Sequence, residues 1–337
     1  MKNILVTGGV GFIGSHTVVE LYNKGYKPIV IDNLSNSQKG VVDGIEKIIG
    51  SSIPFEQVDL VDYPSAKAVF QKYNFDGVIH FAAFKAVGES VEKPIAYYEN
   101  NLVSLINLLK LSAEFNVHNF IFSSSCTVYG QPDKLPVDES FPKLPAESPY
   151  GNTKQIGEEI IEDFCTSKPA FKAVSLRYFN PIGAHDSALI GELPIGVPNN
   201  LVPFITQTAA GIRDKLSVFG GDYNTTDGTC IRDYIHVVDL AKAHIVALEY
   251  SEKMKSNYDF FNVGTGIGFS VLEVIHSFEK VSGMKLNYEI VDRRPGDIEK
   301  IYADTKKVNN ILGWKAELDL DDMMSSAWKW QKSLIRY

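Results

Sequence analysis

The sequence of 337 residues has few cysteines, and they do not form a recognisable pattern. Cys126, Cys165 and Cys230 are an odd number, and no two of them stand at the spacing of metal ligands. This argues against a disulfide framework and against a zinc site. We therefore expect a protein of a reducing, cytoplasmic compartment that holds no metal.

Positive charge is also scarce. Lys and Arg number 33 against 41 Asp and Glu, which gives a formal net charge of -8. Broad binding to nucleic acid or to an anionic membrane is not expected, because both need a large positive surface. An anionic small molecule remains compatible with this composition, since it needs only two or three local cations.

Long apolar runs are missing as well. The sequence has no stretch of about 18 apolar residues, the length that a transmembrane helix requires. The apolar segment at its start is short and leads directly into glycines, which is not typical of a signal peptide. No membrane partner is expected.

What the sequence does contain, over residues 1–180, is a regular alternation of short apolar runs and helical patterns. Runs that are apolar along their whole length are typical of strands buried on both faces. Their alternation with helices predicts an α/β fold with a doubly wound parallel sheet of the Rossmann type. The expected strands are residues 4–7, 28–31, 54–58, 77–81, 119–123 and 173–177, and residues 95–114 are expected to form a helix.

The pattern changes after Phe179. Residues 180–200 are rich in Pro and Gly and predict a long loop, which in a compact domain is usually functional. We expect residues 1–180 to form a nucleotide-binding domain and residues 181–337 to form mainly a smaller, mixed α/β substrate lobe, with some segments returning to the first domain. In the second part, helices are expected near 201–212, 236–250, 271–282 and 319–331, and strands near 216–219, 260–263 and 286–290.

A glycine-rich turn follows the first expected strand, in the stretch Thr7-Gly8-Gly9-Val10-Gly11-Phe12-Ile13-Gly14. In a dinucleotide site, Gly8 permits the tight turn, Gly11 lets a pyrophosphate approach, and Gly14 lets the helix pack against the strand. Asp32 ends the second strand, where it can bond a ribose 2′-hydroxyl and repel a 2′-phosphate, so NAD is favoured over NADP. Asp59 could reach the adenine or could equally cap the next helix.

Tyr150 and Lys154 stand four residues apart at the start of a helical pattern, so they share one helix face. To act as a base near neutral pH, the phenol needs its pKa lowered by about 3 units, or roughly 4 kcal/mol. A nearby Lys and an oxidised nicotinamide, both positive, could supply this. A hydroxyl among Ser123–Ser125 could bond a substrate oxygen, although these serines could also only form a turn.

The chain resembles the NAD-dependent epimerase/dehydratase family of the extended short-chain dehydrogenases/reductases, and within it the UDP-glucose 4-epimerases. The resemblance covers nearly the whole chain, and its later blocks are more specific than the glycine turn. It is carried by residues 7–14, 32–37, 85–90, 123–130, 150–154, 177–185, 198–201, 232–237 and 328–330.

The resemblance implies a role for each matching residue. Tyr150 would take the proton of the sugar 4-hydroxyl, Lys154 would hold the nicotinamide ribose and tune Tyr150, and Ser125 would bond the 4-oxygen. The implied cofactor contacts are Gly8, Gly11, Phe12, Ile13, Gly14, Asp32, Asn33, Asn36, Ser37, Asp59, Leu60, Phe81, Ala82, Lys85, Asn100, Ser123, Tyr150, Lys154 and Tyr178. The implied substrate contacts are Lys85, Ser125, Thr127, Tyr150, Phe179, Asn180, Asn200, Leu201, Arg232, Arg294, Asp297 and Ile301.

Some of these positions remain open. Arg suits a diphosphate because it binds it bidentately, but Arg232 and Arg294 could by themselves form an ordinary salt bridge. Ala83 and Phe84 stand where the family usually has Gly and Leu, and Cys126 stands where it has Ala. Ile301 is intermediate between the small residues that resemble N-acetylhexosamine-accepting enzymes and the aromatic ones that resemble excluding enzymes.

The resemblance implies interconversion of UDP-galactose and UDP-glucose through a transient 4-keto sugar, with tightly bound NAD and possible extension to UDP-N-acetylhexosamines. A nucleotide-sugar 4,6-dehydratase is an alternative, although such enzymes place Asp-Glu where Cys126-Thr127 stands here. A non-enzymatic NAD-binding scaffold is another, although such proteins tend to lack the Tyr or the Lys. A homodimer through the helices of residues 95–114 and 155–164 is implied, but the apolar stripes are more simply core-facing.

Overall fold

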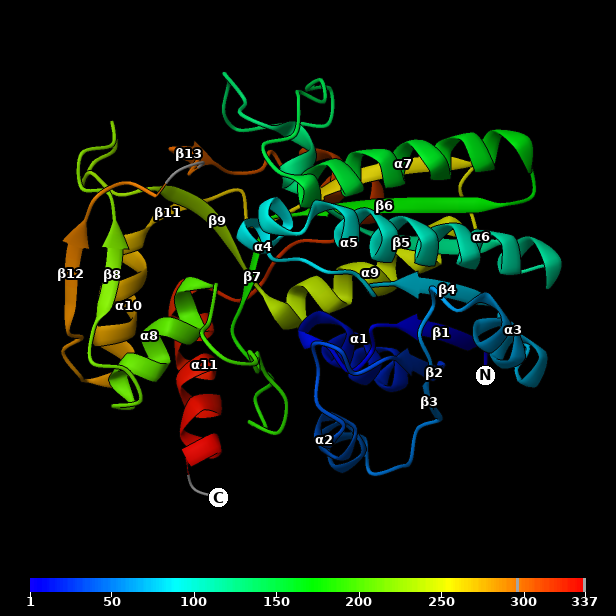
Figure 1. Cartoon of the computed structure of the whole chain (residues 1–337), viewed down its shortest axis with the longest axis horizontal. Coiled ribbons are helices and arrows are strands. Elements are labelled where there is room, and N and C mark those ends of the chain that lie inside the picture. Colours follow the sequence, from blue (N-terminus) through cyan, green and yellow to red (C-terminus); the bar gives the residue numbers. More distant parts are fainter. Residues whose placement is uncertain (295–296, 336–337) are drawn as a thin grey trace.

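The computed structural model describes residues 1–294 and 297–335, so residues 295–296 and 336–337 of the expected substrate lobe lie outside it (Figure 1). The first part is built on a seven-stranded sheet in which every neighbouring pair is parallel. This confirms the predicted doubly wound sheet. In spatial order its strands are β3 (Phe55–Gln57), β2 (Lys27–Asp32), β1 (Asn3–Thr7), β4 (Gly77–His80), β5 (Asn119–Ser125), β6 (Lys172–Tyr178) and β10 (Tyr258–Val263).

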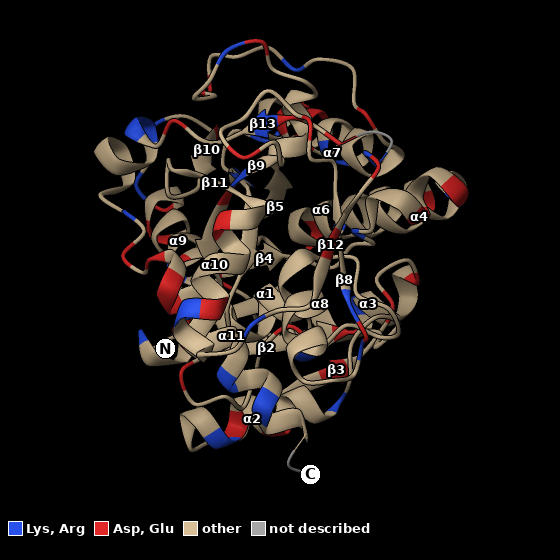
Figure 2. Cartoon of the chain, turned by 90° about the vertical axis from the view of Figure 1, so that its left-hand side faces the viewer, with Lys and Arg blue, Asp and Glu red and all other residues tan. Residues whose placement is uncertain are grey.

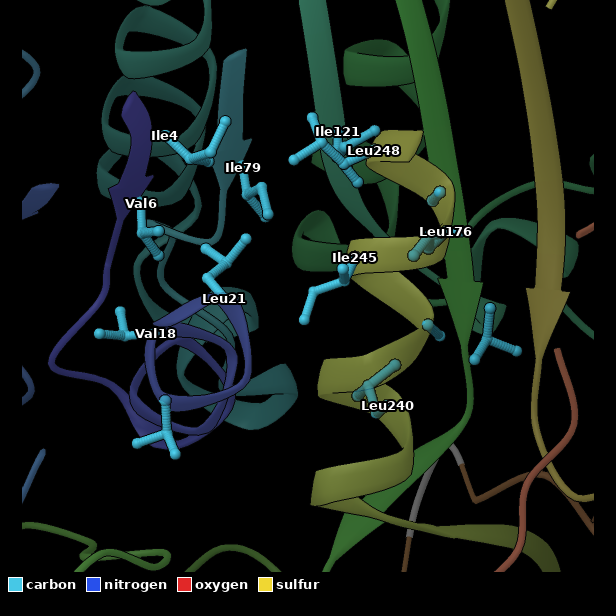
Figure 3. Packing of buried hydrophobic residues seen from close by; sticks show 14 of the residues in the cluster. Ile4, Val6, Val18, Leu21, Ile79, Ile121, Leu176, Leu240, Ile245 and Leu248 are labelled. Carbon is cyan, nitrogen blue, oxygen red and sulfur yellow. The ribbon is translucent and has the colours of Figure 1, made fainter. Parts of the chain in front are cut away.

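Helices cover both faces of this sheet because successive strand residues point to opposite sides. On one face, Ile4 and Val6 of β1 pack against α1 (Phe12–Asn23), α2 (Gly40–Ile49) and α9 (Val237–Ser251). Figure 3 shows Val18 and Leu21 of α1 and Leu240, Ile245 and Leu248 of α9 gathered around the strand side chains. On the other face, Leu5 packs with residues of α3 (Tyr63–Lys72), α6 (Ser104–Glu114) and α7 (Pro149–Ser167).

The helix expected over residues 95–114 is interrupted. It begins as α5 (Pro94–Tyr98), widens into a π-helical turn, η1 (Glu99–Val103), and continues as α6. A short helix, α4 (Val87–Glu92), precedes it, and a 3-10 turn, η2 (Cys126–Tyr129), follows β5. A π-helical turn within a helix commonly marks a functional site, and this one carries Asn100.

The second part forms a smaller lobe at the carboxyl end of the sheet (Figure 1). Its core packs Ile205 of α8 (Leu201–Ala209), Phe278 of α10 (Val271–Ser282) and Met323 of α11 (Leu320–Ile335) around short strands. These strands are β7 (Asn180–Ile182), β8 (Leu216–Phe219), β9 (Ile231–His236), β11 (Gly268–Ser270), β12 (Tyr288–Val291) and β13 (Lys300–Ile301), with a π-helical turn η3 (Val308–Leu312) near the end.

The structure differs from the sequence expectation at several places in this part: the short strands β11 and β13 and the turn η3 were not predicted, nor were β7 and β9. Residues 180–200 were expected to be a loop, but Asn180–Ile182 form β7, which pairs with β9. The strand β9 itself was not predicted, because its alternation of Arg232, Asp233 and Tyr234 does not resemble an apolar run. None of the helices within residues 1–294 and 297–335 is long and apolar enough to cross a membrane.

Candidate active site

The glycine turn lies between β1 and α1 and closes on the end of β4. Gly8 has a φ of +67°, and a Cβ there would lie 2.7 Å from the backbone nitrogen of Ala82. A Cβ on Gly14 would lie 2.2 Å from the carbonyl oxygen of Gly8. Both positions therefore require glycine. Helix α1 begins at Phe12 after Gly11, which has no side chain to cap it, so the N–H groups of Phe12 and Ile13 at its first turn remain for an anionic ligand.

Asp32 holds this turn to the end of β2. Its buried carboxylate accepts hydrogen bonds from the backbone nitrogen of Val10 at 3.1 Å and of Leu34 at 2.9 Å. The hydroxyl of Ser37 donates to it at 2.8 Å, while Asn36 is exposed nearby. The carboxylate thus lies beside the glycine turn, as binding to a ribose requires.

Asp59 does not cap α3, because the N-cap residue of that helix is Asp62. Its carboxylate instead accepts a hydrogen bond from the amide of Asn33 at 3.1 Å and from the backbone nitrogen of Val61 at 2.9 Å. Leu60 is buried beside it, and its carbonyl accepts from Asn107 at 2.9 Å. Of the two predictions for Asp59, helix capping is wrong.

The end of β4 completes this side of the site. The backbone nitrogen of Phe81 donates to the carbonyl of Thr7 at 3.0 Å, which places Phe81 and Ala82 against the glycine turn. Phe84 donates its N–H to the Asn101 side chain at 2.8 Å, and the Asn100 amide donates to the same Asn101 oxygen at 2.9 Å.

Tyr150 and Lys154 lie together at the carboxyl end of β5. Ser148 caps α7 by accepting from the backbone nitrogen of Gly151 at 3.1 Å, so the helix starts just before the tyrosine. Both side chains are buried, and the Lys154 Nζ lies 5.8 Å from the centre of the Tyr150 ring. The predicted shared helix face is therefore present.

The serines of β5 surround this pair. The carbonyl of Ser123 accepts a hydrogen bond from Lys154 Nζ at 2.6 Å, and its hydroxyl is hydrogen bonded to the phenol of Tyr178. The Ser125 hydroxyl accepts from the backbone nitrogen of Thr127 at 3.3 Å. Ser125 thus also caps the turn η2, as the alternative for these serines expected.

The chain's own groups do not make Tyr150 acidic. Burial raises the pKa of its phenol above the usual value, Tyr178 adds to this, and a hydrogen bond with Ser125 opposes it. Burial also lowers the pKa of Lys154 to about 8, while the charge of Glu158 opposes that shift. The prediction that neighbouring positive groups lower the phenol pKa is thus not met by Lys154 alone.

A second cluster lies where the two parts of the chain meet. The ammonium of Lys85 is 3.5 Å from Glu192 Oε1, and the amide of Asn200 donates to the same oxygen at 2.5 Å. Leu201 follows as the first residue of α8. Sequence reasoning missed Glu192, whose only signal was its position in the Pro- and Gly-rich segment 180–200.

Arg232, Arg294 and Asp297 form a third cluster. Arg294 donates to Asp297 through Nη2 at 2.7 Å and through Nε at 3.2 Å. Arg232 Nη2 lies 3.8 Å from the same carboxylate. The three side chains are brought together. In this arrangement the two arginines form a salt bridge, which was the alternative prediction to binding a diphosphate.

Two of the residues predicted for the sugar site lie on strands that pair with β9, which carries Arg232. Phe179, Cys126 and Ile301 pack in one apolar cluster, and Ile301 on β13 pairs with Arg232 on β9. Asn180 begins β7. The Thr127 Oγ1 is buried and has no hydrogen-bond partner among the described residues, so it could bond a ligand hydroxyl.

Charged side chains of both signs are distributed over the molecule. In the view of Figure 2, Lys and Arg are interspersed with Asp and Glu. Within residues 1–294 and 297–335, no group of three or more His, Cys, Asp or Glu side chains could hold a metal ion. The arrangement offers a dinucleotide turn, a buried phenol and ammonium, and arginines beyond them.

Comparison with known proteins identifies relatives over the full length. The family model described as GDP-mannose 4,6 dehydratase matches residues 5–327. UDP-glucose 4-epimerase of Mus musculus is 49% identical over 338 residues, which cover 98% of this chain and 97% of that protein. The crystal structure of UDP-glucose 4-epimerase from Bifidobacterium longum in complex with NAD+ and UDP has a TM-score of 0.95 at 48% identity, covering 98% of each chain.

A third relative has a broader name. The structure of the UDP-Glc/GlcNAc 4-epimerase from Campylobacter jejuni has a TM-score of 0.85 at 39% identity and covers 99% of this chain and 100% of that one. From the matched family model, the near-complete alignments and the shared fold, the chain belongs to the nucleotide-sugar epimerase/dehydratase family and, within it, to the UDP-glucose 4-epimerases.

Proposed function

We propose that this chain interconverts UDP-galactose and UDP-glucose, with NAD as its tightly held cofactor. The observation that carries the proposal is the placement of Tyr150 and Lys154 beside Ser123 and Ser125, at the carboxyl end of β5, which β4 separates from β1 and its glycine turn. The names of the relatives, which include a complex with NAD+ and UDP, support the same ligands.

The residues of the glycine turn fit a dinucleotide. Gly8 and Gly14 leave no room for a Cβ, the first turn of α1 is uncapped, and Asp32 is positioned for the ribose. Bound NAD would supply reversible removal and return of a hydride at the sugar C4, and its oxidised ring would add positive charge beside Tyr150.

Within this site, Tyr150 would take the proton of the 4-hydroxyl at its phenol oxygen and return it once the transient 4-keto sugar has presented its other face. Lys154, fixed by the Ser123 carbonyl, would orient the ribose, and Ser125 would bond the sugar 4-oxygen. The raised pKa of Tyr150 means that this step needs positive charge beyond that of Lys154.

The same reasoning assigns the remaining predicted contacts. Asn33, Asn36, Ser37, Asp59, Leu60, Phe81, Ala82, Asn100 and Tyr178 would surround the dinucleotide. To bind the diphosphate, Arg232 and Arg294 would give up part of their contact with Asp297. Lys85 and Asn200 would likewise exchange their contact with Glu192 for one with the diphosphate. Thr127, Phe179, Asn180, Leu201 and Ile301 would border the uridine or the sugar.

The test is epimerisation of UDP-galactose by the purified protein without added reductant. Tyr150→Phe should lower turnover by orders of magnitude and leave UDP binding nearly unchanged. Full activity of that variant would contradict the assignment of the base. Because the matched family model is described as a dehydratase, loss of water from GDP-mannose and a dTDP-hexose is measured in parallel, and such a reaction would favour the alternative activity.

Acceptance of UDP-N-acetylhexosamines belongs to the same proposal. Ile301 is buried at the wall of the sugar site and is smaller than an aromatic residue, and one relative is named a UDP-Glc/GlcNAc 4-epimerase. Turnover of UDP-galactose and UDP-N-acetylgalactosamine should be compared side by side. Ile301→Tyr should abolish the second activity more strongly than the first.

We also propose that the chain forms a homodimer and lies in the cytoplasm. We further propose that its two domains divide at about residue 180, with β10 and α9 returning to the first domain. The core-facing residues of the predicted dimer helices, such as Leu105 and Ile161, are buried in the subunit. Val87 and Val91 of α4 and Ile95 of α5 are nevertheless 50%, 62% and 75% exposed, which supports a second copy covering them. Sedimentation of the wild type and of Ile95→Lys tests this.

A further inference from the structure

A chain of buried polar side chains runs from the catalytic helix to the wall of the sugar site. It begins on α7 with Glu158, which lies one turn after Lys154 on the same helix face. It ends at Val137, in the segment between η2 and α7. Sequence reasoning assigned no role to any of its members.

The first link is an ion pair inside the sheet–helix interface. Arg177 of β6 donates to Glu158 through Nε at 2.9 Å and through Nη2 at 2.6 Å, and Ser124 of β5 donates to the same carboxylate at 2.6 Å. All three side chains are buried. The pair therefore joins α7, which carries Tyr150 and Lys154, to the two strands that carry the serines and Tyr178.

The second link passes to the last strand of the sheet. Arg177 Nη1 donates to the phenol of Tyr129 at 3.0 Å, and that phenol donates to Asn262 Oδ1 at 2.7 Å. Tyr129 and Asn262 are both fully buried. Because the guanidinium has no acceptor oxygen, the donor direction along this chain is fixed from Arg177 to Asn262.

The third link reaches the sugar-site wall. The amide of Asn262 donates to the carbonyl of Val137 at 2.8 Å. Val137 in turn accepts from the backbone nitrogen of Asp304 at 2.7 Å and donates its own N–H to the carbonyl of Tyr302 at 3.0 Å. Residues 302–304 directly follow Ile301, which packs with Val137 and Phe179 in one cluster.

We propose that Glu158, Arg177, Tyr129 and Asn262 are positioning residues that hold the Ile301 wall of the sugar site in a fixed place relative to Tyr150 and Lys154. The proposal rests on the proposed function of that site. None of the four needs to touch the substrate, because their effect passes through α7 at one end and through Val137 at the other.

The energetics favour positioning over bulk stability as the role. Desolvation of a buried ion pair offsets much of its attraction, so such a pair contributes little net stability compared with apolar packing. A fully satisfied buried network does, however, restrict the structure to one arrangement. The 4-keto sugar must turn within the site and then meet the same Tyr150 phenol again. This requires that the Ile301 wall keep a fixed position relative to Tyr150.

Tyr129→Phe tests the chain with a small change, since it removes one hydroxyl and keeps the ring that packs on Phe141. We expect kcat for UDP-galactose to fall about tenfold, with the Kd for UDP changed less than twofold. Tyr258→Phe is the matched control: it removes a tyrosine hydroxyl that bonds Ser175 at 3.0 Å between the same two strands, but it breaks no link of the chain. Its kcat should stay within twofold of the wild type.

The outcomes separate the two proposals. An inactive wild type would refute the proposed function. An active wild type with unchanged kcat in Tyr129→Phe would refute the positioning role, as would a loss of kcat that the Tyr258→Phe control shares. Asn262→Ala should also lower kcat, and the double variant should be no slower than Asn262→Ala, because both changes break one chain. Additive losses would contradict the chain.

Discussion

Lys154 donates a hydrogen bond to the main-chain carbonyl of Ser123 across 2.6 Å. The ammonium is thereby attached to the strand end that also carries Ser125, and it lies 4.9 Å from the centre of the Phe122 ring. Its location is set by the backbone of β5 and not by a side chain that could change rotamer. A ligand at this place would meet a cation of fixed position.

Replacing Lys154 should impair catalysis more than folding. Lys154→Met removes the cation and its link to Ser123, and we expect kcat to fall about 100-fold, within the range typical of groups that assist proton transfer. Steady-state turnover of UDP-galactose measures this. Lys72→Met, which removes an exposed lysine paired with Glu56, should leave kcat unchanged. Equal losses in both variants would contradict the role of Lys154.

The pH dependence of turnover should reflect Lys154. Its pKa is lowered to about 8 by burial, so the cation is present below that pH and is lost as the pH rises through it. We therefore expect kcat to decline on the alkaline side of about pH 8. The charge of Glu158 raises the Lys154 pKa, so Glu158→Gln should move this decline to lower pH. A pH profile identical to that of the wild type would exclude this coupling.

Gly14 should not tolerate even one methyl group. The Cβ of Gly14→Ala would lie 2.2 Å from the carbonyl oxygen of Gly8, so the turn must distort. We expect the free energy of unfolding to fall by about 1–3 kcal/mol, the usual cost of overpacking, with loss of NAD during gel filtration. Gly40→Ala, where nothing lies within 4 Å of the added Cβ, should be neutral or slightly stabilising. Retention of NAD by Gly14→Ala would argue against a pyrophosphate at this turn.

Two buried histidines should make the fold sensitive to acid. His16 and His244 bond the carbonyls of Phe12 at 2.7 Å and Leu240 at 2.8 Å through Nδ1, and their buried Nε2 atoms have no partner among the described residues. Burial lowers their pKa values to about 3 and about 4. Since an unfolded histidine titrates near 6.5, only the unfolded state gains these protons as the pH falls from about 6.5 to 4.

The free energy of unfolding should consequently fall by about 2 kcal/mol per histidine between pH 7 and pH 5. Urea unfolding at the two pH values measures this. His244→Gln should reduce the difference by the share of one histidine, whereas His118→Gln, a change of an exposed residue, should not. A stability that does not change with pH in the wild type would show that these rings are protonated in the folded state.

The sheet and the dinucleotide turn could be predicted because their signals are local. Apolar runs of four or five residues, the glycines of residues 8–14, and Tyr150 with Lys154 at helical spacing each indicate a structure formed by neighbours in sequence. The strand β9 gave no such signal, because the charged residues Arg232 and Asp233 lie among its apolar ones. The π-helical turn at Glu99–Val103 likewise has no local pattern to reveal it.

The polar pairs of the site could not be predicted for a different reason. Glu158 lies in the stretch Glu158-Glu159, which resembles a solvated helix face, and Arg177 ends an apolar run. Only the tertiary fold shows that the first glutamate is buried against that arginine while Glu159 is exposed. The contacts of Lys85 and Asn200 with Glu192 similarly join segments far apart in the chain.

The strand β10 has a consequence for truncated fragments of the chain and for its synthesis. Because β10 comes from residues 258–263 and pairs with β6, a fragment ending near residue 180 would leave the β6 backbone as an open edge. Unpaired edges recruit other strands, so such a fragment should aggregate where the whole chain does not. During synthesis, likewise, β6 lacks its neighbouring strand β10 until Val263 has been added to the chain.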